Sequence, residues 1–233
     1  MCFRSLSATS SSKLTMSDWL AWQVVDSAFP VGVFAHSWGL ESAWQSGHVP
    51  DSGALQRFLH ASIQQTGYGS IPLLNAAYRR PERWRALDEL ADTFLINSVA
   101  NRASRVQGRT LVATATRVWP CEGMTTVSQH AAAGRAHVAP FSGLTFRVIG
   151  LSLETARKVM LYGAARGVLS AAVRLGIVGS YEAQRLQYEA GPPLDLIHDD
   201  CRALGDEDVC QTAPIIDLLQ AGHDRLYSRL FQS

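Results

Sequence analysis

Lysine is nearly missing from this sequence: it occurs only at positions 13 and 158, and the formal net charge of the 233 residues is +1. A polyanion held by bulk electrostatics usually requires a basic face, so we expect no nucleic-acid partner. The other basic residues are arginines, whose planar guanidinium suits fixed ion pairs and protein interfaces. This composition favours structured contacts over a diffuse basic surface.

Cysteine is also scarce, with Cys2, Cys121, Cys201 and Cys210 and no Cys-x-x-Cys pair. This spacing fits neither a disulfide framework nor a zinc knuckle, and it predicts a reducing, cytoplasmic location. The longest apolar stretch, residues 138–153, is interrupted by Pro140 and Arg147. It is too short to cross a bilayer, so we expect no membrane association.

Sequence motifs for several enzyme classes are missing as well. Neither lysine follows glycine, which excludes a phosphate-binding P-loop and a GTPase of that class. No histidine is followed by glutamate, as a zinc protease helix requires, and no Gly-x-Ser-x-Gly nucleophile elbow is present. We therefore expect neither an enzyme nor a tightly bound cofactor.

The apolar residues recur at helical spacing along most of the chain, and no alternating strand pattern or internal repeat is visible. We predict a disordered Ser-rich tail at residues 1–16, because this stretch lacks the Arg-rich amphipathic face of a transit peptide. Residues 17–233 are predicted to form one all-α domain, a helical bundle of roughly eight to ten helices. The expected helices cover residues 17–27, 37–46, 51–67, 70–78, 81–95, 97–119, 143–150, 152–176, 180–189, 195–204 and 213–231.

Glycines carry two further predictions. Gly108 falls inside a predicted helix, where glycine costs about 1 kcal/mol relative to alanine, so we expect a neighbouring backbone to lie close to it. Residues 120–143 lose the helical period and read as loop, with one short helix near 129–133. Gly163, Gly167 and Ala171 form a narrow strip that could face either the core or a dimer interface.

Residues 26–41 are the most distinctive stretch, with three large apolar rings between a Pro-Gly turn and a predicted helix start at Ser37. Asp26, His36 and Ser37 could be imagined as a hydrolytic triad. We favour a structural role, in which Asp26 and Ser37 cap helices and His36 holds the turn, because no oxyanion-hole motif accompanies them. His198 and Cys201 could likewise bind a metal, but two good ligands are too few, and a solvated helix start is favoured.

The segment near residues 210–233 is predicted to dock a partner. It combines Ile215, Tyr227 and Phe231 with Arg225 and Arg229. Terminal segments are usually ordered only when they dock onto something, and this mixture suits a protein groove. A last helix that closes the chain's own core is the equal alternative.

The stretch 26–41 resembles the signature of the urease accessory protein UreF family, except that Val33 replaces a second glycine. Residues 150–154, 166–179, 210–220 and 223–231 resemble later segments of the same family. The resemblance implies an all-α homodimer that binds UreD, recruits and regulates the GTPase UreG, and assists nickel insertion into apo-urease. It implies these partner-binding residues: Asp26, Ser27, Phe29, Pro30, Gly32, Phe34, His36, Ser37, Gly39, Glu41, Arg174, Ile215, Arg225, Tyr227, Arg229 and Phe231.

Two functions thus follow from the sequence. The first is a scaffold or chaperone with no chemistry of its own, in which any nickel would be transient and His36 is the candidate contact. The alternative is a small helical hydrolase that uses Asp26, His36 and Ser37.

Overall fold

The computed structural model describes residues 16–30 and 35–232. Residues 1–15 of the predicted tail, and the signature residues Gly32 and Phe34, lie outside this part of the chain. All regular structure in the described residues is helical, so the all-α prediction is confirmed. None of the described helices is both long enough and apolar enough to span a membrane.

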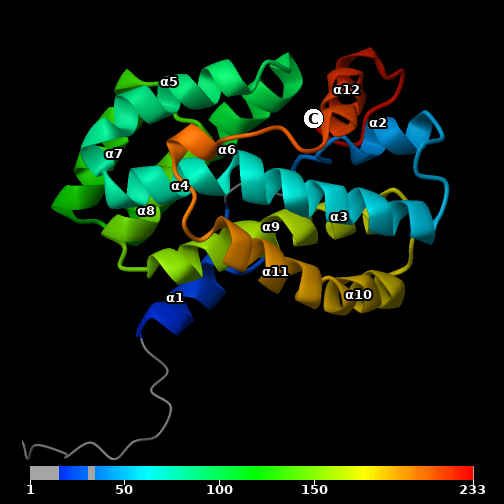
Figure 1. Ribbon diagram of the computed structural model, residues 1–233, viewed down its shortest axis with the longest axis horizontal. Coiled ribbons are helices and arrows are strands. Elements are labelled where there is room, and N and C mark those ends of the chain that lie inside the picture. Colours follow the sequence, from blue (N-terminus) through cyan, green and yellow to red (C-terminus); the bar gives the residue numbers. More distant parts are fainter. Residues whose placement is uncertain (1–15, 31–34, 233) are drawn as a thin grey trace, which may run out of the picture.

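Twelve α-helices and three short 3₁₀ turns follow one another along the described residues (Figure 1). The helices are α1 (Met16–Val25), α2 (Leu40–Gln45), α3 (Ser52–Gly69), α4 (Ile71–Arg79), α5 (Trp84–Phe94), α6 (Ser98–Val118), α7 (Glu122–Ala133), α8 (Val138–Val148), α9 (Leu153–Arg174), α10 (Ser180–Glu189), α11 (Gly191–Cys201) and α12 (Pro214–Ala221). The 3₁₀ turns are η2 (Pro81–Arg83), η3 (Asp206–Asp208) and η4 (His223–Arg225). The number of helices exceeds the eight to ten predicted.

The largest correction concerns residues 120–143: the sequence predicts loop with one short helix near 129–133, whereas the structure has the longer helix α7 and the start of α8. The sulfur of Cys121 accepts the backbone N–H of Met124 at 3.4 Å and caps α7. Pro140 is the third residue of α8, where the N–H that proline lacks would have no acceptor within the helix. The composition looked irregular, but each unusual residue occupies a position that a helix tolerates.

The turn between α7 and α8 is held by one buried carboxylate. Asp88 of α5 accepts the backbone N–H groups of Arg135, Ala136 and His137 at 2.7–3.1 Å. His137 is fully buried and contacts Ser104 and Asp92 through its two ring nitrogens, each at 3.1 Å. These contacts fix where α8 begins, and they join residues that are far apart in the sequence.

Helix boundaries were predicted with mixed success. Asp51 and Asn97 cap α3 and α6 as the sequence indicated, each through a side-chain oxygen that accepts a backbone N–H. The prediction for Ser37 is wrong, because α2 begins after Gly39, whose φ of 85° requires glycine. The helix predicted over 213–231 ends at Ala221, and the chain continues through η4 into irregular structure.

The prolines after α10 correct one further boundary. Pro192 and Pro193 lie in the first turn of α11, where proline is tolerated, so this helix begins at Gly191 and not near residue 195. It also ends earlier than predicted, at Cys201.

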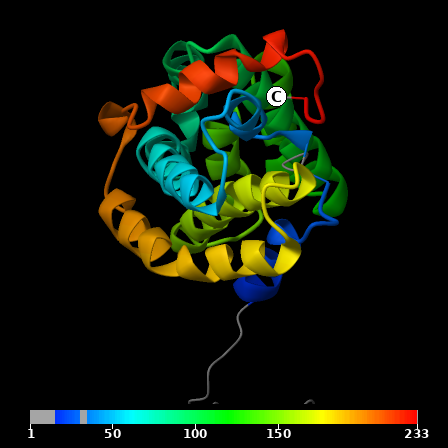
Figure 2. The same cartoon turned by 90° about the vertical axis from the view of Figure 1, so that its right-hand side faces the viewer.

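Helix α9 lies at the centre of the molecule and contacts α1, α2, α3, α4, α8, α10 and α11 (Figures 1 and 2). Its residues contribute to the largest core cluster through Leu161, Ala165 and Val168, which pack with α3. Ala171, from the predicted strip of small residues, is also buried in this cluster. At least this part of the strip therefore faces the chain's own core.

The prediction for Gly108 is confirmed. A Cβ atom at this position of α6 would lie 2.0 Å from the carbonyl oxygen of Ala136, far inside any real contact. Gly143 of α8 approaches α4 in the same way, since its Cβ would lie 2.4 Å from the carbonyl oxygen of Leu74. Glycine allows α6 and α4 to pack directly against backbone near α8.

Gly108→Ala should lower the free energy of unfolding by about 1–3 kcal/mol, because the added methyl group must push two backbones apart. Gly163→Ala is the matched control: it also lies within a helix, but its Cβ would meet nothing within 4 Å. That variant should gain about 0.5–1 kcal/mol from helix propensity. Urea denaturation of both variants measures the difference, and equal effects at the two sites would contradict the packing argument.

Candidate functional site

The signature stretch and the C-terminal segment meet at the carboxylate of Glu41. This side chain is 1% exposed. Its oxygens accept the backbone N–H groups of Leu230 at 2.6 Å and Phe231 at 3.2 Å, and Nε2 of His223 lies 3.0 Å away. One buried acidic group therefore fixes the last described residues to the start of α2.

Further contacts join the same two segments. The backbone N–H of Gln232 donates to the carbonyl of Ala35 at 2.9 Å, and the Gln45 side chain donates to the carbonyl of Ser228 at 3.0 Å. Gly39 lies so close to α12 that a Cβ would be 3.1 Å from Cβ of Gln220. Two constraints therefore require glycine at position 39: its positive φ and the close approach of Gln220.

Helix α12 and the C-terminal segment lie beside α2 (Figure 2), and all three carry exposed apolar side chains. We call this exposed region the terminal surface and define it by five exposed side chains of α2, α12 and the C-terminal segment: Trp44, Ile215, Leu218, Tyr227 and Leu230. Leu218 is 70% exposed and Tyr227 is fully exposed. Arg225 and Arg229 are exposed on the same segment, and Arg229 lies 3.5 Å from Asp224. Of the residues predicted here, Ile215, Arg225, Tyr227 and Arg229 are thus exposed, whereas Phe231 is buried in the main core cluster.

The first half of the signature stretch is anchored elsewhere. Phe29 is buried and stacks on Trp119, with ring centroids 5.4 Å apart. The carbonyl of Pro30 accepts the hydroxyl of Thr114 at 3.0 Å. Asp26 does not cap a helix, since its carboxylate accepts the N–H of Ala28 at 2.6 Å within the turn after α1. These residues hold the stretch on α6 and not on the terminal surface.

Arg174 connects the end of α9 to the C-terminal segment. Its guanidinium carbon lies 4.2 Å from the centroid of the Phe231 ring, within the range of a cation–π contact. Arg174 and Ser27 also line an open groove of about 410 Å³, formed largely by α9 and α10. Arg174 therefore borders both the signature turn and the C-terminal segment.

His36 and Ser37 are buried between the two anchored halves, with exposed fractions of 4% and 0%. The pKa of His36 is lowered from 6.5 to about 4, chiefly by burial and in smaller part by the neighbouring His223. His36 is therefore neutral near pH 7. Ser37 offers no exposed hydroxyl to a substrate, and Asp26 serves the turn, so the geometry gives no support to a hydrolytic triad.

The metal alternatives gain no support from the geometry. Within residues 16–30 and 35–232, no group of three or more His, Cys, Asp or Glu side chains could hold an ion. His198 is largely buried and lies 3.3 Å from Asp199, and Cys201 is buried in the main core cluster. Burial raises the pKa of the Cys201 thiol to about 11, which disfavours the thiolate that metals bind.

Sequence reasoning missed two residues of this site, His223 and Gln220. Both are buried, His223 against Glu41 and Gln220 against Gly39. Each is a polar residue among apolar ones near the end of the chain, which suggests burial. That pattern does not indicate which distant residue, Glu41 or Gly39, each one contacts.

Glu41→Gln should loosen the C-terminal segment, because a carboxamide presents an NH₂ group where two or three donors require an acceptor. We expect a loss of about 2–3 kcal/mol in the free energy of unfolding and at least tenfold faster hydrogen exchange at the amides of Leu230 and Phe231. Glu122→Gln, at an exposed position in the first turn of α7, is the control and should change stability by less than about 0.5 kcal/mol. Unchanged exchange at both amides would refute the role of Glu41.

Stability should fall as the pH is lowered from about 6.5 to about 4. In this window the unfolded chain takes up a proton that buried His36 does not bind, so protonation favours unfolding. Burial lowers the pKa of His137 too, and its contribution has the same sign. His36→Gln should therefore flatten part of the dependence, whereas His48→Gln, at an exposed position, should leave it intact. Urea titrations at pH 7, 5.5 and 4.5 test this, and identical slopes for wild type and His36→Gln would contradict it.

Comparison with known proteins identifies the family. The UreF family model matches residues 49–191. Urease accessory protein F of Oryza sativa subsp. indica is 33% identical over 219 residues, covering 91% of this chain and 84% of the relative. The protein of that name in Arabidopsis thaliana is 33% identical and covers 92% of both chains, and UreF of Trichodesmium erythraeum is 29% identical over 90% and 94%. The chain belongs to the UreF family of urease accessory proteins.

Proposed function

We propose that this protein is a scaffold for urease maturation that binds UreD and recruits the GTPase UreG. In the assembled complex it regulates GTP hydrolysis and supports nickel insertion into apo-urease. It acts in the cytoplasm as a homodimer, it is not an enzyme, and any nickel contact is transient. Membership of the family supports the urease connection, and the partners are our inference.

The observation that carries the proposal is the terminal surface. Two segments that resemble the family, residues 26–41 and 210–233, are bonded to each other through Glu41 and present exposed leucine, isoleucine and aromatic side chains. Side chains of this kind, bordered by arginines, are typical of protein interfaces. Leu218, which is 70% exposed, and the fully exposed Tyr227 gain little burial within this chain, so a partner is what would cover them. We therefore assign this surface to UreD.

A scaffold also accounts for the burial of the polar signature residues. His36, Ser37 and Glu41 all lie below 5% exposure, where they cannot reach a substrate but can hold α2 and the C-terminal segment in place. Their role in this proposal is to position the surface. UreG supplies the nucleotide chemistry, because this sequence has no P-loop lysine.

The test is co-purification with UreD and UreG. Leu218→Arg should reduce capture of UreD at least tenfold, since it places a charge on the terminal surface at a side chain that is already 70% exposed. Tyr181→Ala is the matched control, because Tyr181 is 95% exposed on α10, away from the terminal surface. A chain that ends at Ala221 should lose UreD entirely. Capture of UreD that is equal for wild type and Leu218→Arg would disprove the assignment of the surface.

The wider proposal is tested separately by urease activation. Cells that produce urease with all other accessory proteins should need this chain for nickel-loaded enzyme. Urease that reaches full nickel content without it would refute the maturation role. Robust ester hydrolysis by the purified protein that is abolished by His36→Ala would favour the hydrolase instead.

A further inference from the structure

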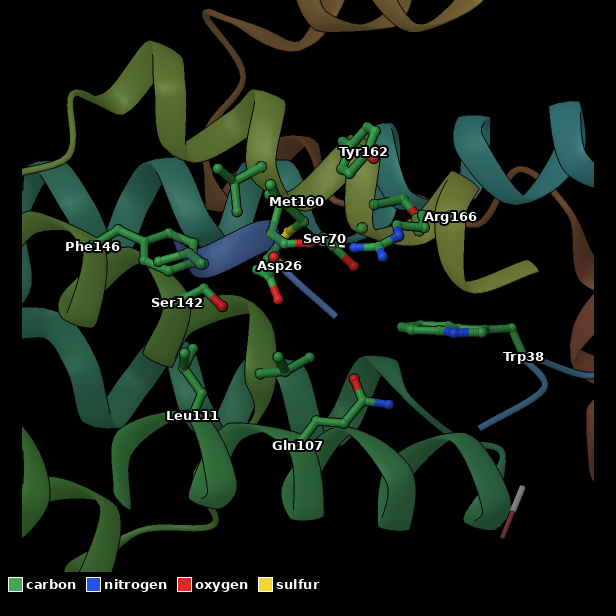
Figure 3. Close-up of a pocket in the computed structure, with 17 residues that line it drawn as sticks. Asp26, Trp38, Ser70, Gln107, Leu111, Ser142, Phe146, Met160, Tyr162 and Arg166 are labelled. Carbon is green, nitrogen blue, oxygen red and sulfur yellow. Dashed lines mark hydrogen bonds between the residues drawn. The ribbon is translucent and has the colours of Figure 1, made fainter. Parts of the chain in front are cut away.

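Two adjoining, partly open cavities lie among the helices of the bundle, and the second is bordered by α12, whose exposed residues Ile215 and Leu218 belong to the terminal surface. The first has a volume of about 140 Å³ and is lined by residues of α1, α3, α6, α8 and α9. The second has a volume of about 120 Å³ and extends towards α5 and α12. Four residues line both: Trp38, Ser70, Gln107 and Val138. Trp38 and Gln107 thus stand where the two spaces meet (Figure 3).

The first cavity is mostly apolar. Leu111, Phe146, Val159 and Met160 form its walls, and all four belong to helices that are packed together in one core cluster. An enclosed space of about 150 Å³ with walls of this kind can hold a benzene-sized molecule. The dimensions of this cavity therefore suit a small ring.

Gln107 is a polar residue on the wall of both cavities. The side chain of Gln107 is 3% exposed, yet none of the residues that the structure describes makes a hydrogen bond with its amide. Two other buried amides have partners: Asn75 donates to Cys201 and Leu204, and Asn97 donates to Asp217. Gln220, which lines the second cavity, is like Gln107 in making no side-chain hydrogen bond within the described residues. Because Gln107 lines the cavities, a molecule that enters them can supply the hydrogen bonds that the described residues do not.

Trp38 provides a second group of the same kind. Its indole N–H is buried and has no acceptor within the described part of the chain. Its backbone has φ of 58°, a left-handed conformation that large side chains rarely adopt. Figure 3 shows its indole beside the space into which Gln107 extends from α6. Strained backbone and a few polar groups on the wall of an apolar cavity are both common at binding sites, and Trp38 and Gln107 combine them in one place.

We propose that these cavities form a binding site for a small neutral molecule with a ring-sized apolar body and an amide or similar head group. The apolar walls hold the body, the carbonyl of the head accepts the indole N–H of Trp38, and the amide of Gln107 supplies the complementary donor and acceptor. A neutral ligand fits, because the two groups without partners are themselves neutral and a buried charge would be left uncompensated. The charged residues of the first cavity, Asp26 and Arg166, already bond to the backbone of Ala28 and Val25.

Benzamide is the probe, with toluene as the same ring without the head group and benzoate as its charged counterpart. Calorimetric titration of the full-length protein should show one benzamide per chain at millimolar concentrations or below. Benzoate and toluene should each bind at least about fivefold more weakly. Failure of benzamide to bind at about 10 mM would mean that the cavities hold water only, and this would overturn the proposal.

Two variants locate the site. Gln107→Leu keeps the side-chain volume and removes the amide. Trp38→Phe keeps an aromatic ring and removes the indole N–H. Each variant should weaken benzamide binding about tenfold, which corresponds to the loss of one or two hydrogen bonds. Binding of toluene should not weaken in either. Gln129→Leu, at an exposed position of α7, is the matched control and should bind all three probes like wild type.

A second measurement covers the case in which Trp38→Phe fails to fold. Changes in the NMR signals of the Gln107 side-chain NH₂ and the Trp38 indole N–H on addition of benzamide to wild-type protein should saturate together with the calorimetric titration. Benzamide that binds equally to wild type and Gln107→Leu, or that leaves both signals unmoved, would refute the site.

Discussion

The buried carboxylate of Glu41 is the constraint on which the rest of this structure's functional surface depends. A carboxylate with almost no exposed area is tolerable only when its oxygens are well supplied with donors. Here the donors come from the backbone of Leu230 and Phe231 and the ring of His223. The C-terminal segment is therefore held by an electrostatic contact together with the burial of Phe231, while Tyr227 and Leu230 remain exposed. The contacts that fix the segment are therefore different from the exposed side chains that it offers to a partner.

The sequence revealed much of the helical framework. Apolar spacing located most of the helices, and the caps at Asp51 and Asn97 were recognisable because they depend on a side chain and an amide two or three residues away. Gly108 could also be interpreted, since a glycine inside a long helix has few uses other than a close approach. All of these features are local.

What the sequence concealed depends on contacts between distant residues. The turn before α8 is held by Asp88, almost 50 residues earlier, so residues 134–137 gave no local sign of their conformation. The last helix was predicted ten residues too long, because an amphipathic pattern cannot show that Leu230 and Phe231 donate to Glu41 instead of continuing the helix. The sequence indicated both the signature stretch and the C-terminal segment, but it did not indicate that the two are in contact. Gly32 and Phe34 lie outside the described residues.

The burial of the signature residues also changes how they are interpreted. Asp26, His36 and Ser37 include the residue types of a hydrolytic triad, yet Ser37 has no exposed surface and His36 is neutral near pH 7. Residue types alone indicate possible chemistry, whereas exposure decides whether a substrate can meet it. In this chain the polar signature residues act inward, on the placement of α2 and the segment that follows α12.

The bond between Glu41 and Leu230 spans 189 positions of the chain, which has a consequence during synthesis. At about 5–20 residues per second, a ribosome makes the donors roughly 10–40 s after the acceptor. Until then the carboxylate can remain hydrated and the surface does not exist. A nascent or prematurely terminated chain therefore cannot display it, so the contact itself distinguishes finished molecules from fragments.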